Sequence, residues 1–242
     1  MRFMKLGATM RIPAEACGCG ACIPVALTRR SLFAGAAAGL LAGVPTYARA
    51  QTNLTPAQAF ARLMDGNQRF AEGRLTSDRE DLVLLRRGTA EKQEPFAAVL
   101  SCSDSRVPVE LVFDQSIGHV FVARVAGNIA SPDIIASLEY GAAGLGTKVI
   151  LVLGHANCGA VKAAIQGKAA PGRISALYTA IHPAVEQAGP DLVAVIRANA
   201  RLQARLVRDS SPVISELAKQ GQIEVMAGYY DLASGRVSPI EL

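Results

Sequence analysis

Two cysteines, a histidine, an aspartate and an arginine lie in two short segments of this sequence. The first segment, SCSDSRVP at residues 101–108, contains Cys102, Asp104 and Arg106. The second segment, GHANCGA at residues 154–160, contains His155 and Cys158. Two thiolates and one imidazole form a soft-to-borderline ligand set that suits zinc. Three protein ligands leave a fourth tetrahedral position for water or a nearby carboxylate, which is typical of a catalytic zinc site.

The spacing of Asp104 and Arg106 predicts a second chemical unit beside these ligands. On an extended or turning segment, side chains two residues apart can reach the same side. The arginine then keeps the aspartate ionised, because a nearby positive charge lowers the pKa of a carboxyl group. Such a carboxylate can accept a hydrogen bond from a metal-bound hydroxide, or it can move onto the metal itself. The alternative is a solvated ion pair in a loop.

Each thiol also has an alternative interpretation. Cys102 and Cys158 are the only cysteines after residue 50, and in an oxidising compartment they could form a disulfide. A redox protein that cycles these two thiols would then bind no zinc. Cys158 alone could instead be a small buried residue at the start of a helix.

The elements around these segments predict that the two segments meet. Three short apolar runs, at 95–102, 119–126 and 148–155, are nearly continuous in hydrophobicity, which is typical of parallel strands covered on both faces. The first run ends at Cys102 and the third at His155. Open parallel sheets bind their ligands beyond the carboxyl ends of the strands. Both reactive segments are therefore expected at one crevice.

Helical patterns lie between and around the strands. A capping box, Thr55 with Gln58, starts a helix over residues 55–73, and a charged connection with a short helix follows. Further helices are predicted from Ser131 to about Ala143 and over 157–165, 190–209 and 211–221, and a strand hairpin over 222–240. The expected fold class is α/β, with a central, mainly parallel sheet of four to five strands flanked by helices.

The charge distribution excludes one class of partner. The chain carries 25 basic and 20 acidic residues, of which residues 1–50 hold six basic groups and one acid. The remaining 192 residues therefore hold 19 of each sign. A neutral body of this kind has no basic face for nucleic acid.

Residues 1–50 have the pattern of an export signal. A twin arginine, Arg29-Arg30, precedes a short apolar stretch and an A-x-A site, which predicts cleavage after Ala50, passage through the twin-arginine system and a periplasmic location. The apolar stretch is short for a bilayer span, so no stable membrane anchor is expected after cleavage; an uncleaved anchor is the alternative. Cys17, Cys19 and Cys22 resemble a small metal-binding cluster but fall inside this leader. The catalytic domain is expected to span residues 51–242.

Taken together, CSDSR and GHANCGA resemble the motifs of the β-class carbonic anhydrases. FDQSIGHVFVARVAGN, ASLEYG and GYYDLASGRV agree with this resemblance, which runs from about Thr55 to Ile240. It implies zinc held by Cys102, His155 and Cys158 beside an Asp104–Arg106 dyad. It also implies reversible hydration of carbon dioxide to bicarbonate and a proton by a zinc-bound hydroxide, since zinc lowers the pKa of bound water from about 15.7 toward neutrality.

The resemblance carries further expectations about assembly and substrate. Gln115 matches a glutamine that hydrogen-bonds the substrate from the partner subunit, and the helix over residues 55–73 is expected to pack on that subunit in a homodimer or homotetramer. Gly127 and Asn128 match a strand-to-helix turn. Relatives that hydrolyse carbonyl sulfide or carbon disulfide on the same kind of zinc site supply an alternative function, and a non-catalytic zinc protein is another. The chain has no tryptophan, which puts a regulatory bicarbonate pocket of some relatives in doubt.

Overall fold

A computed structural model describes residues 52–77 and 82–242 of the chain. The predicted leader, with Cys17, Cys19 and Cys22, lies outside the described residues. Within them, no helix is long and apolar enough to cross a membrane. The five strands of the sheet are β1 (Ala97–Ser101), β2 (Val120–Arg124), β3 (Val149–His155), β4 (Glu224–Tyr230) and β5 (Val237–Ile240).

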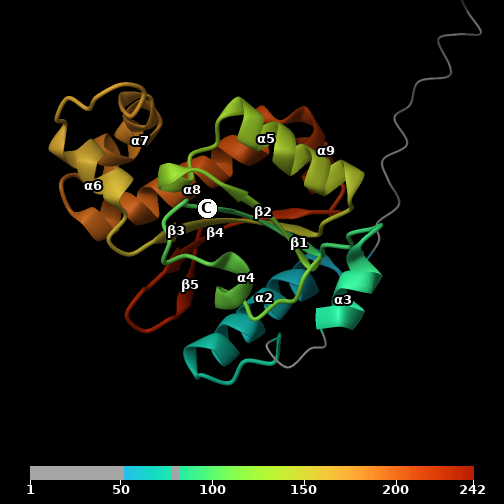
Figure 1. Ribbon diagram of the computed structural model, residues 1–242. Helices are drawn as coiled ribbons and strands as arrows, with labels where there is room; N and C mark the ends of the chain where they lie inside the picture. The colour runs from blue at the N-terminus through green and yellow to red at the C-terminus, as the bar shows by residue number, and fades with distance from the viewer. Residues whose placement is uncertain (1–51, 78–81) are drawn as a thin grey trace, which may run out of the picture. The chain divides into compact units, whose positions relative to one another are not determined.

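The strands form one sheet in the order β2-β1-β3-β4-β5 (Figure 1). β1 pairs in parallel with β2 and β3, and β3 pairs in parallel with β4. β5 runs antiparallel to β4, as the predicted hairpin requires. The predicted α/β class with a mainly parallel sheet is thus confirmed.

Helices cover both faces of this sheet, which explains the continuous apolar runs of its strands. Ala98 and Leu100 of β1 point to one face, where they pack in a core with residues of α5, α6, α7, α8 and α9. Ala97 and Val99 point to the other face and pack with residues of α2 and α4. Figure 1 shows the two helical layers on opposite sides of the strands. The helices are α2 (Pro56–Ala71), α3 (Leu82–Thr89), α4 (Val109–Val112), α5 (Pro132–Glu139), α6 (Gly159–Gln166), α7 (Ser175–Ala188), α8 (Leu192–Ser210) and α9 (Pro212–Lys219).

The start of α2 follows the predicted capping box. The Gln58 N–H donates to Thr55 Oγ1 at 3.2 Å, and the Thr55 N–H donates to Gln58 Oε1 at 2.9 Å. These two bonds satisfy main-chain donors that have no partner within the helix. Ser131 stands at the N-cap position of α5 as predicted, although its side chain makes no capping hydrogen bond. α5 is continued to Gly144 by a π turn, η3 (Tyr140–Gly144).

Sequence patterns did not predict α7. From the sequence, Pro183 predicts the end of a helix, but it lies inside α7, so this prediction is wrong. Proline removes one helical hydrogen bond and favours a helix end. The flanking side chains of Ile181 and Ala184 are fully buried in the core, and this burial favours continuation of the helix.

Candidate metal centre and active site

The ends of β1 and β3 bring the two predicted segments together. The two strands are direct neighbours, and Ser101, the last residue of β1, lies beside Leu153 of β3. Cys102 therefore follows β1 at the same edge of the sheet where β3 ends in His155. Cys158 is the N-cap residue of α6. The predicted crevice at the carboxyl ends of the strands is thus where the reactive side chains lie.

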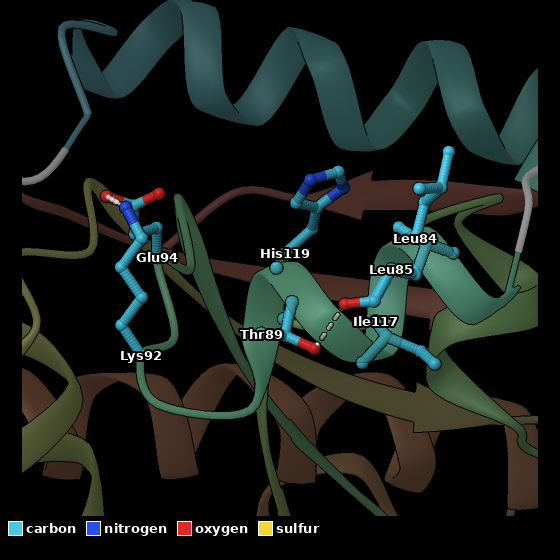
Figure 2. A pocket seen from close by; sticks show the side chains of 9 residues that line it. Leu84, Leu85, Thr89, Lys92, Glu94, Ile117 and His119 are labelled. Carbon is cyan, nitrogen blue, oxygen red and sulfur yellow. Dashed lines mark hydrogen bonds and ion pairs between the residues drawn. The ribbon is translucent and has the colours of Figure 1, made fainter.

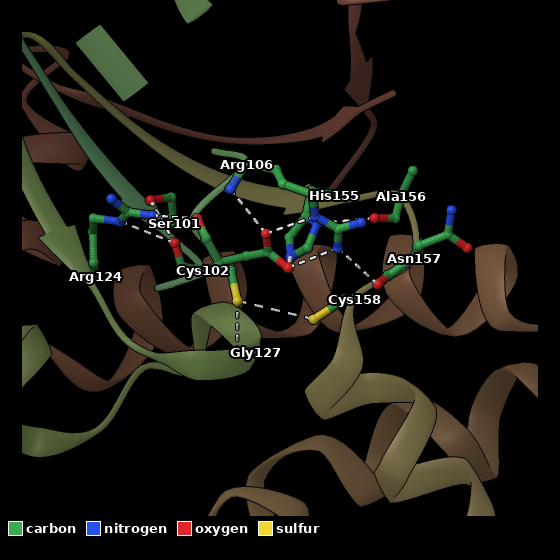
Figure 3. A network of polar contacts seen from close by, with 10 residues as sticks. Ser101, Cys102, Arg106, Arg124, Gly127, His155, Ala156, Asn157 and Cys158 are labelled. Carbon is green, nitrogen blue, oxygen red and sulfur yellow. Dashed lines mark hydrogen bonds and ion pairs between the residues drawn. The ribbon is translucent and has the colours of Figure 1, made fainter. Parts of the chain in front are cut away.

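Cys102, His155 and Cys158 form a buried group of three possible ligand atoms. Their ligand atoms all lie within 4.8 Å of one another. The two sulfur atoms are 4.0 Å apart and face each other in Figure 3. A disulfide needs about 2.05 Å, so the two thiols are free. Zn–S bonds of about 2.3 Å at a tetrahedral centre place two sulfurs about 3.8 Å apart, and the observed separation fits this arrangement.

The imidazole of His155 is prepared to act as a ligand through one nitrogen. Its Nδ1 lies 2.9 Å from the carbonyl oxygen of Ala156. A carbonyl only accepts hydrogen bonds, so Nδ1 carries the proton and Nε2 keeps its lone pair. Nε2 is buried and has no hydrogen-bond partner among the described residues. A buried nitrogen without a partner is costly, and a metal ion between His155 and the two sulfurs would satisfy it.

The two thiols influence each other strongly. The hydrogen bond with Cys158 and the hydrogen bond from the Gly127 N–H lower the pKa of the Cys102 thiol. The hydrogen bond to Cys102 and burial raise the pKa of the Cys158 thiol. Two negative charges 4.0 Å apart repel each other, so without a cation the pair keeps one proton. A divalent cation removes this repulsion, and the donor set therefore fits zinc.

Asp104 and Arg106 form the predicted dyad next to these ligands. Arg106 Nε donates to Asp104 Oδ1 at 2.9 Å, and Nη2 donates to Oδ2 at 2.8 Å. The Arg106 main-chain N–H adds a third bond to Oδ1 at 3.0 Å. These hydrogen bonds hold the pKa of the Asp104 carboxyl well below its usual range. Asp104 Oδ2 lies 3.9 Å from His155 Nε2, so the fixed carboxylate stands beside the ligand group.

Arg124 supports this segment from the neighbouring strand β2. Its Nε donates to the carbonyl oxygen of Cys102 at 3.0 Å (Figure 3), and its Nη2 donates to the carbonyl oxygen of Asp104 at 2.6 Å. Arg124 therefore fixes the main chain that carries a ligand and the dyad carboxylate. Sequence reasoning missed it. The one signal was its place at the end of a predicted strand next to the one that delivers Cys102.

Gly127 contributes its main chain to the same site. It lies in a short 3-10 turn, η2 (Ala126–Asn128), with φ of +76°, and its N–H donates to Cys102 Sγ at 3.3 Å. A Cβ atom at this position would lie 2.7 Å from Ile181 Cδ1. The predicted turn is confirmed, and it also reaches a ligand sulfur.

Gln115 is not part of this ligand group within its own chain. It is buried, and its Nε2 donates to the carbonyl oxygen of Phe113 at 2.8 Å. No described contact joins it to Cys102, His155 or Cys158. A role at the active site therefore needs a partner subunit, and the structure of one chain leaves that role a prediction.

A pocket of about 410 Å³ lies elsewhere on the molecule (Figure 2). Apolar side chains of α3 and of Ile117 line it, together with Lys92, Glu94 and His119. None of its lining residues is a ligand or a dyad residue. Its size alone does not mark it as the place of the chemistry, because the reactive side chains lie at the ends of β1 and β3.

Comparison with known proteins agrees with this site. A sequence model of the family described as "Carbonic anhydrase" matches residues 97–237. "Carbonic anhydrase 2" of Mycobacterium tuberculosis (strain CDC 1551 / Oshkosh) is 32% identical over 192 residues, covering 76% of this chain and 92% of that protein.

Two solved structures share the fold. A Coccomyxa β-carbonic anhydrase in complex with acetazolamide is 26% identical with a TM-score of 0.58, covering 74% of this chain and 85% of that one. One of two tetrameric β-carbonic anhydrases from the ascomycete Sordaria macrospora has a TM-score of 0.61 at 23% identity, covering 76% and 97%. The sequence match, the fold and the ligand geometry agree, and this chain belongs to the β class of the carbonic anhydrase family.

Proposed function

We propose that this chain catalyses the zinc-dependent, reversible hydration of carbon dioxide to bicarbonate and a proton. The observation that carries the proposal is the buried Nε2 of His155, which has no hydrogen-bond partner among the described residues and is grouped with two thiols within 4.8 Å. The proton on Nδ1 and the burial of all three side chains prepare these residues to bind a metal. Cys102, His155 and Cys158 would hold the zinc. When bound, zinc supplies Lewis acidity that makes a water molecule nucleophilic near neutral pH.

The protein's own groups orient the reacting water. Asp104 stays ionised and accepts a hydrogen bond from that water. This bond turns a lone pair of the water oxygen toward carbon dioxide. Arg106 donates two side-chain bonds to Asp104 and a third to the carbonyl oxygen of Asn157 at 3.3 Å. It thereby fixes the direction of the carboxylate. We assign Asp104 as a catalytic residue and Arg106 as the residue that positions it.

The proposed active unit is a homo-oligomer, a dimer or a tetramer. Gln115 supports this proposal, because it matches a substrate-binding glutamine of the family and no described contact joins it to the ligand group of its own chain, so it would act at the site of a partner subunit. Gln115 follows α4, which packs with α2 in the same core. We propose that α2 also contacts the partner subunit. Sedimentation velocity of the wild-type protein should give a dimer or a tetramer, and a monomer with full activity would exclude this role of Gln115.

We further propose that residues 1–50 are an export signal and that the catalytic domain, residues 51–242, acts in the periplasm. The pattern from Arg29 to Ala50 supports this proposal. N-terminal sequencing of the protein recovered from a periplasmic extract should begin at Gln51. A cytoplasmic protein that retains Arg29 and Arg30 would contradict the proposal.

The test of the proposed activity combines metal analysis with stopped-flow measurement of carbon dioxide hydration. We expect one zinc per chain and a rate well above that of buffer. Turnover of carbonyl sulfide and carbon disulfide, measured in parallel, separates the proposed substrate from its sulfur analogues. A zinc-loaded protein that accelerates no hydration would establish a non-catalytic zinc protein. A metal-free protein with a Cys102–Cys158 disulfide would establish a redox protein.

A further inference from the structure

Two buried amide side chains on α8 lie in the core behind the metal centre. Asn199 is fully buried and Gln203 is 3% exposed. They are four residues apart and therefore neighbours on one face of the helix. Burying an amide is costly unless its donors and acceptors find partners. Both amides do find hydrogen-bond partners, and these partners indicate what the two side chains do.

The hydrogen bonds of both amides hold the η2 turn in place. Asn199 Nδ2 donates to the carbonyl oxygen of Gly127 at 2.9 Å. Gln203 Nε2 donates to Asn199 Oδ1 at 3.2 Å, which fixes the direction of the Asn199 amide. The same Gln203 nitrogen donates to the carbonyl oxygen of Ala180 at 3.0 Å, and Gln203 Oε1 accepts from the Ala130 N–H at 2.8 Å. Gln203 thus links Asn199 to Ala180 of α7 and to Ala130, which lies two residues after η2.

Gly127 connects Asn199 to the ligand sulfur of Cys102. Its carbonyl oxygen is held by Asn199, and its N–H donates to Cys102 Sγ at 3.3 Å. Ile181 of α7 closes the space beside its Cα, since an added Cβ would lie 2.7 Å from Ile181 Cδ1. The two peptide groups that flank Gly127 are therefore fixed from opposite sides, one by α8 and one by the thiol.

We propose that Asn199, held by Gln203, is a positioning residue that fixes the Gly127 N–H on Cys102 Sγ and so sets how strongly this thiolate donates to the metal. The inference rests on the proposed function, because it requires zinc at Cys102, His155 and Cys158. A hydrogen bond to a metal thiolate withdraws electron density from the sulfur and keeps the metal more electrophilic. Groups that orient ligands in this way typically change metal affinity or activity by about 10- to 100-fold.

The test uses the full chain with two substitutions of similar volume, Asn199→Leu and Gln203→Met. Zinc affinity is measured by competition with a chromogenic chelator, and the sulfur-to-metal absorption band is recorded on the cobalt(II)-substituted protein. We expect Asn199→Leu to weaken zinc binding about 10-fold, because the Gly127 N–H would no longer hold Cys102 Sγ in position for the metal. The cobalt band should move to longer wavelength, since loss of the N–H···S bond raises the energy of the sulfur electrons. Gln203→Met should show the same changes at smaller size.

Val207→Ala is the matched control, because Val207 is a fully buried apolar residue of the same helix. It should lower the thermal unfolding temperature while leaving the cobalt band and the zinc affinity unchanged. If both amide variants behave as this control does, the inference is overturned and the proposed function stands. If Asn199→Leu does not fold, Gln203→Met decides by the same two measurements. A wild-type protein that binds neither zinc nor cobalt would overturn the inference and the proposed function together.

Discussion

Replacing Asp104 with asparagine separates the proposed orienting role of this residue from metal binding. Asparagine keeps the size of the side chain but removes its charge. It also places an amide nitrogen against one of the two Arg106 donors that now bind Oδ1 and Oδ2. Cys102, His155 and Cys158 are untouched, so zinc content should remain at one per chain.

The magnitude of the expected loss follows from one hydrogen bond. A bond to a charged acceptor contributes about 1.5–3 kcal/mol, and each 1.36 kcal/mol of lost transition-state stabilisation is a factor of ten in rate. The Asp104→Asn variant should therefore hydrate carbon dioxide roughly 10- to 150-fold more slowly. Stability should change little, since the Arg106 side chain is 52% exposed and solvent-exposed ion pairs contribute little to folding.

The assay is stopped-flow hydration with a pH indicator, accompanied by zinc analysis and urea unfolding of the same samples. Asp133→Asn, an exposed carboxylate in the first turn of α5, serves as the charge-matched control and should keep the wild-type rate. A fully zinc-loaded Asp104→Asn variant with the wild-type rate would refute the orienting role. A loss of rate that merely follows a loss of zinc would assign Asp104 to metal retention instead.

Three further predictions concern the metal, pH and the turn at Gly127. The Cys158→Ser variant should lose zinc. Removing the metal from the wild-type protein with a chelator should lower the free energy of unfolding by about 2.7 kcal/mol relative to the protein with free zinc at 100 times the Kd. Equal thermal unfolding with and without chelator would argue against a metal at Cys158. Because its folded pKa is lowered, Asp104 contributes a small amount of stability above its ordinary pKa of about 3.9, and urea titrations should show this small contribution lost as the pH falls through the folded value. Asp104 is then ionised throughout pH 6–9, so a rise of the hydration rate toward alkaline pH reports the deprotonation of the reacting water. A flat rate profile over this range would contradict a water whose pKa two thiolate ligands keep high. The Gly127→Ala substitution should lower the free energy of unfolding in urea by about 1–3 kcal/mol, because Gly127 has a φ of +76° and an added Cβ would lie 2.7 Å from Ile181. Gly88→Ala, which has open space around it, should not lower it. Equal losses for both variants would refute the steric explanation.

The ligand group could be predicted from sequence because Cys102 and His155 stand at the ends of apolar runs and Cys158 follows His155 closely. Cys102 and His155 directly follow or end strands whose continuous hydrophobicity shows burial on both faces. A parallel sheet then brings such strand ends to one edge. The chemistry of the residue types and the topology of the sheet together were enough to predict the ligand group.

The supporting residues could not be predicted in this way. Arg124 reaches across from β2 to two carbonyl groups, and from sequence alone it is an ordinary charged residue at a strand end. Asn199 lies within an amphipathic helix, where its pattern gives no sign of the buried partner Gly127. The length of α7 depended on burial of Ile181 and Ala184, which outweighed the helix-ending preference of Pro183. Each of these results depends on tertiary contacts that no local pattern contains.

The order in which the chain folds follows from the placement of its ligands. Cys102 and Cys158 are 56 residues apart, and they come together only because β1 and β3 pair directly. A newly made or refolding chain offers only His155 and Cys158 as near neighbours, and one pair of ligands binds a metal weakly. Tight metal capture therefore has to wait for this long-range pairing, which is the slow kind of contact in folding. During refolding, the time course of zinc uptake should thus report when the central strand pair forms.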